Sequence, residues 1–177
     1  MDHVGTHFPF PPQPPIPEST RYVDAGCLKI GVEHRFLDND GLQATYEGTE
    51  FEDIFKGQEI VMVDHVLDGV SLHVTDADTG HEYLRFDCFE NHPHYHYLHP
   101  WTSSDEVDNH VVNWDYVAHG SMTPWALEWI RTRLPEMLTE AGGGDLVSRL
   151  NQAEIDRAAD EVERLMKQLA LSGSAAG

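Results

Sequence analysis

The chain has 177 residues, of which 40% are hydrophobic, so we expect one domain with polar extensions that is large enough to fold without disulfides. Its 31 acidic residues outnumber 11 basic ones, which gives a formal net charge of −20. This charge argues against nucleic acid or an anionic membrane as a partner, because phosphate groups would be repelled. Cation binding, a basic protein partner and simple solubility all remain compatible with it.

Cys27 and Cys88 are the only cysteines, and their positions fit neither a disulfide framework nor a four-thiolate zinc site. The first residues lack the basic and apolar regions of a signal peptide, and no run of about 18 apolar residues could span a membrane. We therefore expect a cytoplasmic protein.

The first 20 residues are rich in proline, with Phe-Pro-Phe-Pro-Pro-Gln-Pro-Pro-Ile-Pro at positions 8–17. Proline fixes φ and lacks an N–H donor, so this arm is expected to be polyproline II or irregular. Two roles are open for it. It could dock in an aromatic groove of a partner, or lie over its own domain through Phe8, Phe10 and Ile16.

Alternating apolar residues and turn-forming residues dominate the next part of the chain, up to the histidine-rich segment. Alternation is typical of half-buried strands, and the Asp-, Asn- and Gly-rich stretches between them predict turns. The expected elements are strands at residues 27–33, 42–46, 60–63, 70–74 and 82–89, turns at 38–41, 68–69 and 76–80, and one helical turn at 51–55.

Helical signals follow the histidine-rich segment. Thr123 and Pro124 are a typical N-cap and first-turn pair, and the apolar spacing that follows predicts an amphipathic helix bent at Pro135. Asn151 and Glu154 resemble a capping box before a second helix with a heptad-like apolar stripe. That stripe either packs on the sheet or docks on a partner or a second copy.

Strands first and helices last predict an α+β fold. We expect an antiparallel sheet of about five or six short strands, followed by two C-terminal helices packed on one face. The expected organisation is a proline-rich arm (1–20), an α+β core domain with a histidine-rich hairpin (21–144), an amphipathic helix (145–171) and a disordered tail (172–177).

Four of the 12 histidines fall within residues 83–100, which predict a strand, a reversal at 90–93 and a second strand at 94–98. Pro93 cannot donate to a sheet ladder, which places it at the reversal or on an edge. Residues two apart share a face of a strand, so His94 and His96 are expected on one side, near Asp87 or Arg85 across the hairpin.

Clustered imidazoles are typical ligands of transition metals, so this segment predicts a site for Zn²⁺ or another divalent transition metal. The expected ligands are His92, His94, His96 and His99. Three in a row on a flat strand would converge poorly, which favours two of them plus a ligand from elsewhere. The candidates for that further ligand are Asp87, Cys88, His99, His110 and His119.

Two alternatives use the same residues. In the first, His94 or His96 is the general acid or base of a hydrolase or ribonuclease-like enzyme, and Asp87 orients it. In the second, the histidines fill a polar sheet face of a purely structural subunit.

The pattern Tyr-Leu-Arg-Phe-Asp-Cys-Phe at 83–89, followed by Pro-His-Tyr-His-Tyr at 93–97, resembles the signature of a family of small, uncharacterised bacterial proteins. The resemblance covers about residues 70–141 and implies a common fold, with no activity to transfer. A looser similarity links the Arg-aromatic-Asp strand, the histidine-rich segment and the following helix to small ribonuclease-like toxins of toxin–antitoxin pairs. That similarity implies the enzyme alternative, although this chain lacks the basic surface such toxins use for RNA.

These residues together predict an accessory or binding protein whose histidine-centred site holds a divalent metal. The proline-rich arm and the last helix are the expected docking elements for a protein partner or a second copy. Nucleic acid and membranes are not expected as partners.

Overall fold

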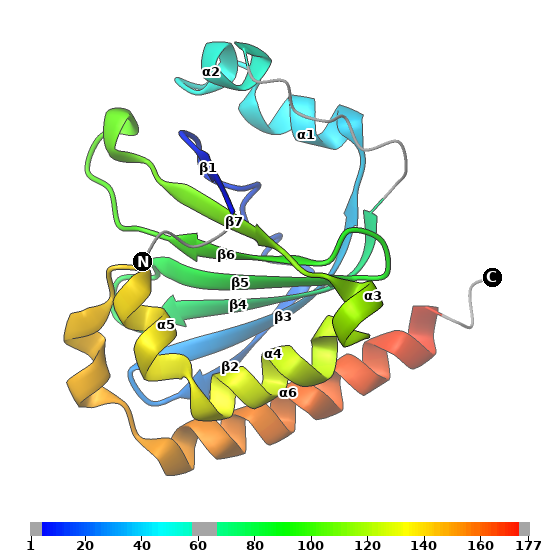
Figure 1. The fold of residues 1–177 in the computed structure, drawn as a ribbon, viewed down its shortest axis with the longest axis vertical. Coiled ribbons are helices and arrows are strands. Elements are labelled where there is room, and N and C mark those ends of the chain that lie inside the picture. Colours follow the sequence, from blue (N-terminus) through cyan, green and yellow to red (C-terminus); the bar gives the residue numbers. More distant parts are fainter. Residues whose placement is uncertain (1–4, 58–66, 174–177) are drawn as a thin grey trace.

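The computed structural model describes residues 5–57 and 67–173, which form a seven-stranded antiparallel sheet with helices on both sides (Figure 1). The strands are β1 (Thr6–Phe8), β2 (Thr20–Ala25), β3 (Leu28–Leu37), β4 (Leu67–Asp76), β5 (Glu82–Phe89), β6 (His94–Leu98) and β7 (Asn109–Asn113). The α-helices are α1 (Asn39–Tyr46), α2 (Glu52–Gly57), α3 (Tyr116–His119), α4 (Met122–Thr132), α5 (Leu134–Glu140) and α6 (Gln152–Gly173). Two 3₁₀ helices, η1 (Ser104–Glu106) and η2 (Gly144–Arg149), complete the described elements.

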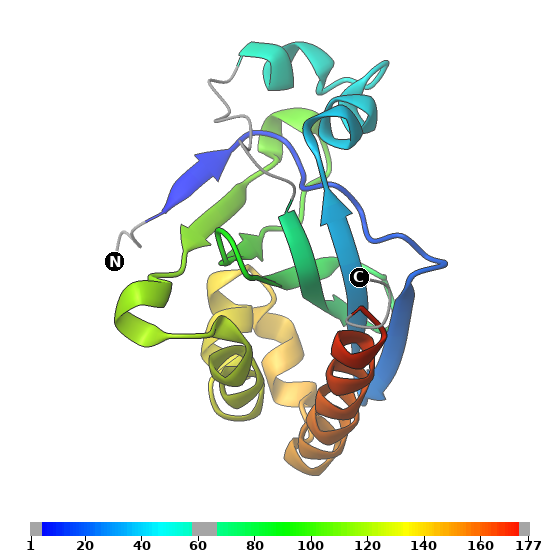
Figure 2. The same cartoon turned by 90° about the vertical axis from the view of Figure 1, so that its right-hand side faces the viewer.

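The sheet has the order β1-β7-β6-β5-β4-β3-β2, so β2 to β7 form an up-and-down meander. β1 pairs with β7 at one edge, whereas β2 forms the other edge. Residues 9–19 of the proline-rich arm therefore have to cross the width of the sheet between β1 and β2 (Figure 2).

The central strands alternate apolar and polar side chains although both faces of the sheet are buried. Leu72, Leu84 and Phe86 point to one face, are fully buried, and pack into a core with residues of α4, α5 and α6. Burial of each such side chain contributes roughly 1.5–3 kcal/mol, so this helix-covered face is the main source of stability. The opposite face is polar and carries His73, His94 and His96.

The arm and helices α1 and α2 cover the polar side. Phe10 packs with Tyr46 of α1 in a small apolar cluster, with ring centroids 5.2 Å apart. The Tyr46 hydroxyl donates to the carbonyl of Pro11 at 2.7 Å. The described part of the arm thus lies over its own domain, although Ile16, one of the three expected anchors, is 44% exposed.

The apolar stripe of α6 belongs to the main core. Asn151 Oδ1 accepts from the backbone N–H groups of Ala153 and Glu154 at 3.1 and 3.4 Å, which confirms the expected N-terminal cap. The buried residues of the stripe are Ile155, Ala158, Ala159, Val162, Leu165 and Met166. They pack within the same cluster as the strands, so the stripe is used inside the chain.

The α+β class and the antiparallel sheet are confirmed, but the expected turn and strand at residues 38–46 are wrong, because this segment is helix α1. The Asp38 carboxylate accepts from the Gly41 N–H at 2.7 Å and caps the helix. Aspartate supports turns and helix starts through the same side-chain-to-backbone bond, so the sequence signal is common to both.

The expected turn at residues 68–69 is also wrong, because β4 runs through it. Gly69 lies opposite Phe89, and a Cβ atom at Gly69 would be 2.9 Å from the Cα of Phe89. The glycine therefore allows two strands to approach closely instead of turning the chain.

The expected helix bent at Pro135 is two helices, since α4 ends at Thr132 and α5 contains Pro135 in its first turn. The cap of α4 is Ser121, two residues before the expected Thr123. β1 and β7 were not expected, and helices cover the sheet on both faces instead of one. The expected strand at 60–63 lies outside the described residues, as do residues 174–177 of the expected tail.

Candidate metal centre

Strands β5 and β6 bring one aspartate and two histidines together on the polar face. Asp87 pairs with His94 and Arg85 pairs with His96 across the hairpin, which reverses at residues 90–93 as expected. Residues at spacing two share a face, so all four side chains start from the same side of the sheet.

The three side chains converge on a common point. Asp87 Oδ2 lies 3.2 Å from His94 Nε2 and 3.1 Å from His96 Nε2. One ligand atom of each residue lies within 4.8 Å of the other two. Ligands at bond lengths of about 2.0–2.1 Å around one ion are roughly 3.3 Å apart, so this triad has the dimensions to hold a metal ion. The expected convergence of His94 and His96 is confirmed.

Each member of the triad is oriented by a further hydrogen bond. His94 Nδ1 donates to the backbone carbonyl of His92 at 2.8 Å, and His96 Nδ1 donates to Asn109 Oδ1 at 2.7 Å. The Ser71 hydroxyl donates to Asp87 Oδ1, the carboxylate oxygen that faces away from the histidines. Metal-ligating histidines usually donate their second ring N–H in this way, and ligating carboxylates are usually hydrogen-bonded as well.

The hydrogen bonds that the two histidines make through Nδ1 determine the protonation of Nε2, the ring nitrogen that faces Asp87. When Nδ1 carries the proton, a neutral imidazole presents an unprotonated Nε2. An unprotonated Nε2 and a carboxylate oxygen about 3 Å apart repel each other unless a cation lies between them. That cation can be a proton on Nε2 or a metal ion.

The pKa values show how the triad meets this requirement without a metal. Burial lowers the pKa of His94, but the hydrogen bond and charge of Asp87 outweigh burial and raise it, which favours an imidazolium. Burial lowers the pKa of His96, and the effect of the Asp87 hydrogen bond is not enough to restore it. Burial raises the pKa of Asp87, but its bonds to both histidines bring it well below its usual range. Only one of the two Nε2 atoms therefore holds a proton readily.

The triad is enclosed but not sealed. The side chains of Asp87 and His96 are 4% and 6% exposed, whereas that of His94 is 17% exposed. His94 also lies against the ring of Phe89, with centroids 5.9 Å apart. An ion would therefore enter from the His94 side, next to the hairpin reversal.

Two expected ligands of the same segment lie outside this triad. His92 sits in the reversal with a φ of 54°, and its side chain is exposed while its carbonyl serves His94. His99 follows β6, and its Nε2 is 4.0 Å from Asp108 Oδ2. Both depart from the strand geometry that would align them with His94 and His96.

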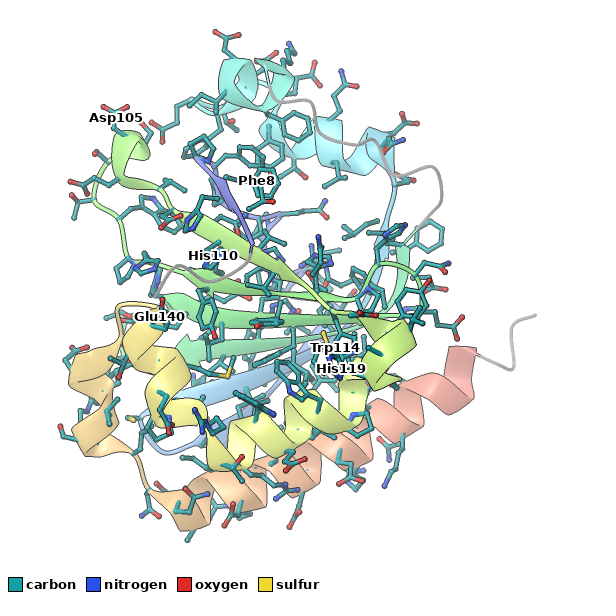
Figure 3. The ribbon with its side chains drawn as sticks, viewed as in Figure 1. Phe8, Asp105, His110, Trp114, His119 and Glu140 are labelled. Atoms are coloured by element: carbon teal, nitrogen blue, oxygen red, sulfur yellow. The ribbon has the colours of Figure 1, made fainter. Side chains whose placement is uncertain are left out.

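The more distant candidates lie elsewhere too, and Figure 3 labels two of them, His110 and His119. Cys88 points to the helix-covered face, where burial raises its pKa to about 12 despite a hydrogen bond to Thr123. His110 belongs to the same face, stacked on His7 with ring centroids 4.1 Å apart. His119 is exposed on α3 and lies 5.0 Å from the ring of Trp114.

A second buried polar group, on the polar face that carries the triad, was not expected. His73 lies between two carboxylates, with Nε2 at 3.0 Å from Glu33 Oε2 and Nδ1 at 2.7 Å from Glu82 Oε1. Because both partners are acceptors, both ring nitrogens must donate and His73 is an imidazolium. Arg85 grips Glu82 with two bonds of 2.9 and 2.6 Å.

One sequence signal could have revealed this network. Polar residues alternate with apolar ones on three consecutive strands, at residues 33 and 35, 71 and 73, and 85 and 87. This pattern normally indicates a solvent-exposed face. Here the proline-rich arm covers that face, and the arm's position depends on contacts far apart in the sequence.

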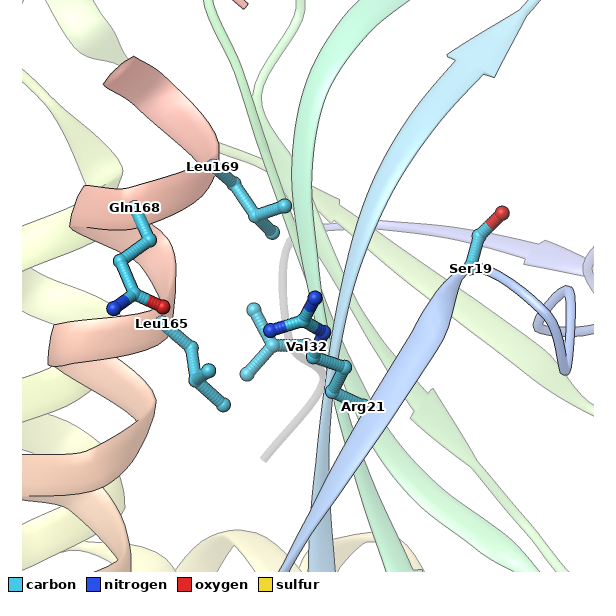
Figure 4. Close-up of a pocket in the computed structure, with 6 residues that line it drawn as sticks. All are labelled: Ser19, Arg21, Val32, Leu165, Gln168 and Leu169. Carbon is cyan, nitrogen blue, oxygen red and sulfur yellow. The ribbon is translucent and has the colours of Figure 1, made fainter. Parts of the chain in front are cut away.

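The described cavities do not include the triad. One, of about 240 Å³, lies between α6 and strands β2 and β3 and is lined by Ser19, Arg21, Val32, Leu165, Gln168 and Leu169 (Figure 4). A second lies between the arm and α1, with Tyr46 and Pro14 in its wall. The described residues form no helix that is long and apolar enough to cross a membrane.

A protein-family model described as Domain of unknown function (DUF7700) matches residues 22–166. The match is wider than the expected resemblance at residues 70–141 and agrees with an uncharacterised family. Comparison with curated proteins and comparison with solved structures gave no significant match. No similarity to ribonuclease-like toxins was found in these comparisons.

Proposed function

This chain belongs to the DUF7700 family, and from the geometry of its polar face we propose that it binds one divalent transition metal ion through Asp87, His94 and His96. The observation that carries the proposal is the pair of Nε2 atoms that Nδ1 hydrogen bonds orient toward a single carboxylate oxygen. A metal ion between the two Nε2 atoms and the Asp87 oxygen removes their mutual repulsion, because each of the three atoms donates a lone pair to the ion.

Zn²⁺ is the first choice for two imidazoles and one carboxylate, a ligand set that also suits non-haem Fe²⁺. Three protein ligands leave at least one coordination position for a water or a substrate. The net charge of −20 supports the proposal, because an acidic surface raises the local concentration of cations.

Metal analysis of protein purified without a histidine tag, followed by calorimetric titration with Zn²⁺, tests this proposal. We expect one ion per chain. His94→Ala and His96→Ala are each expected to lower the affinity by about 100-fold or more, since each variant removes one of the three ligands of the ion. His119→Ala is the matched control, because His119 is exposed and distant from the triad. Equal affinity in all three variants would place the ion elsewhere and refute the proposal.

The affinity is also expected to depend steeply on pH. A bound ion displaces the proton that Asp87 stabilises on His94, so acid competes with the metal. Since the pKa of His94 is raised, the affinity should fall as the pH is lowered through a range above that of a free imidazole. Titrations between about pH 5 and 8 check this, and an affinity independent of pH over that range contradicts imidazole ligation.

A histidine-dependent hydrolase or ribonuclease is the second candidate. The close contact between the raised-pKa His94 and Asp87 supports it, because an acid–base histidine needs such an orienting carboxylate. Activity on RNA that survives a chelator and disappears in His94→Ala or His96→Ala would rank this function above metal binding. The acidic composition favours the metal, since it opposes polyanionic substrates.

We also propose that the chain is an accessory protein that binds a protein partner or a second copy of itself. The surface that we propose for this contact is smaller than expected from the sequence. The described apolar residues of the arm and of α6 pack largely on the chain itself, so a partner would bind their outer faces. A change in assembled mass on removal of the arm would support this role.

A further inference from the structure

A buried arginine near the triad lacks a full set of hydrogen-bond partners. Arg35 of β3 is 1% exposed, yet its Nε and Nη1 atoms have no hydrogen-bond partner among the described residues. Nη1 lies 3.8 Å from Glu33 Oε2, which is close enough for attraction between charges but too long for a hydrogen bond. Buried donors without partners are rare in folded proteins and indicate a missing acceptor.

Arg35 and Arg85 meet at one oxygen atom of the proline-rich arm. The backbone carbonyl of Gln13 accepts from Arg85 Nη1 at 2.8 Å and from Arg35 Nη2 at 3.2 Å. Arg35 Nη2 also contacts the side-chain oxygen of Gln13 at 3.1 Å and the carbonyl of Pro14 at 3.4 Å. Two guanidinium groups thus share neutral acceptors, whereas an anionic oxygen between them would bind more strongly.

This arginine pair lies beside the triad on the same face of the sheet. Arg85 precedes Asp87 by two residues, a separation of about 7 Å along a strand. It also pairs directly with His96 across the hairpin. A small molecule could therefore contact both arginines and a metal ion on the triad.

A metal ion on the triad would add positive charge to this face of the sheet. Among the described residues of this face, each carboxylate already faces cations or imidazoles: Glu33 and Glu82 face the two arginines and His73, and Asp87 faces the two histidines of the triad. A divalent ion on the triad therefore leaves a surplus of positive charge that no further carboxylate among the described residues of this face balances. In an enclosed site such a surplus attracts an anion. This step rests on the proposed metal site, whereas the unpaired donors of Arg35 do not.

We propose that this face binds a small organic carboxylate beside the metal ion. Its carboxylate takes the place of the Gln13 carbonyl between Arg35 and Arg85, and a further oxygen of the ligand reaches the metal. In the planar guanidinium group of Arg35, the N–H groups of Nη2 and Nε lie side by side along one edge. The N–H groups of Nη2 and Nη1 lie side by side along another. A carboxylate at Nη2 therefore engages a second N–H group that a single carbonyl leaves unused. The arm occupies this place and moves aside when the ligand binds.

Calorimetric titration of the metal-loaded full chain with succinate, acetate and inorganic phosphate tests the proposal. We expect succinate to bind with a stoichiometry of one, and Arg35→Lys to lower its affinity at least about tenfold while metal affinity is unchanged, because lysine keeps the charge but not the planar edge. Arg149→Lys on the surface is the matched control. Gln13→Ala keeps the backbone carbonyl but removes two side-chain bonds that hold the arm in place, from Arg35 Nη2 to Gln13 Oε1 and from Gln13 Nε2 to Thr45. The arm should then move aside more easily, so this variant is expected to raise succinate affinity.

Three outcomes overturn the proposal. One is metal-loaded protein that binds neither succinate nor acetate, which leaves the metal site intact and the carboxylate site refuted. Another is phosphate bound more tightly than succinate, which replaces the ligand class. The third is a Gln13→Ala variant with unchanged or weaker succinate binding, a result that does not require a folded Arg35→Lys variant. If the chain takes up no metal, the same titrations of the apo protein decide, and binding that depends on Arg35 supports the anion site alone.

Discussion

Arg85→Ala is expected to lower the free energy of unfolding by about 3–5 kcal/mol, because it leaves a buried carboxylate without its main partner. Arg85 is 2% exposed, donates two hydrogen bonds to Glu82, and donates a third to the carbonyl of Gln13. Burial raises the pKa of Glu82, but the charge and bonds of Arg85 outweigh burial and lower it strongly. Without Arg85 the ionised Glu82 would depend on His73 alone.

Urea unfolding of the wild type and the variant at pH 7 measures this loss. Arg149→Ala provides the control, because Arg149 and its partner Asp78 are both exposed and such pairs contribute little. We expect its unfolding transition to be unchanged. If Arg85→Ala were as mild as that control, the buried network would not depend on the Arg85–Glu82 pair.

The hairpin that carries the triad could be predicted from sequence because its determinants are local. Strand β6 begins and ends at the expected residues, and the reversal at Pro93 fixes which side His94 and His96 share. Asp87 was among the candidate ligands because the hairpin was expected to bring Asp87 or Arg85 near His94 and His96, and the register places it opposite His94. A tight hairpin sets its own register, so sequence spacing is sufficient there.

The supporting residues could not be predicted because their contacts depend on other strands and on the arm. Ser71 reaches Asp87 from β4, and Asn109 reaches His96 from β7, a strand that the sequence did not indicate. Arg35 meets Gln13 only because the chain crosses the sheet between β1 and β2. Local propensity carries no information about which segment covers a polar face.

His73→Leu is expected to destabilise the fold by about 3–5 kcal/mol at neutral pH, because it leaves Glu33 and Glu82 facing each other without the cation between them. His73 is fully buried, and leucine has a comparable volume, so the loss reports charge more than packing. Arg35 and Arg85 also face these carboxylates and retain part of the compensation.

The contribution of His73 to the free energy of unfolding is also expected to depend on pH. Burial lowers the pKa of His73, but the charge of Glu82 and the bonds to both glutamates outweigh burial and raise it above the unfolded value of about 6.5. A raised folded pKa means that the stabilisation is complete below about pH 6.5 and is lost as the pH rises through the folded value. The free energy of unfolding should therefore fall by up to about 1.4 kcal/mol per pH unit in that range.

Urea unfolding of the apo protein between about pH 6 and 9 measures this slope. Because the pKa of His94 is raised as well, the decisive quantity is the difference between the wild type and His73→Leu, with His119→Leu as the control for loss of a histidine. We expect the difference in stability to shrink as the pH rises, since wild-type His73 loses its proton while the variant has none to lose. A difference that is constant with pH would mean that His73 is neutral in the fold and that one of its two contacts is not a hydrogen bond.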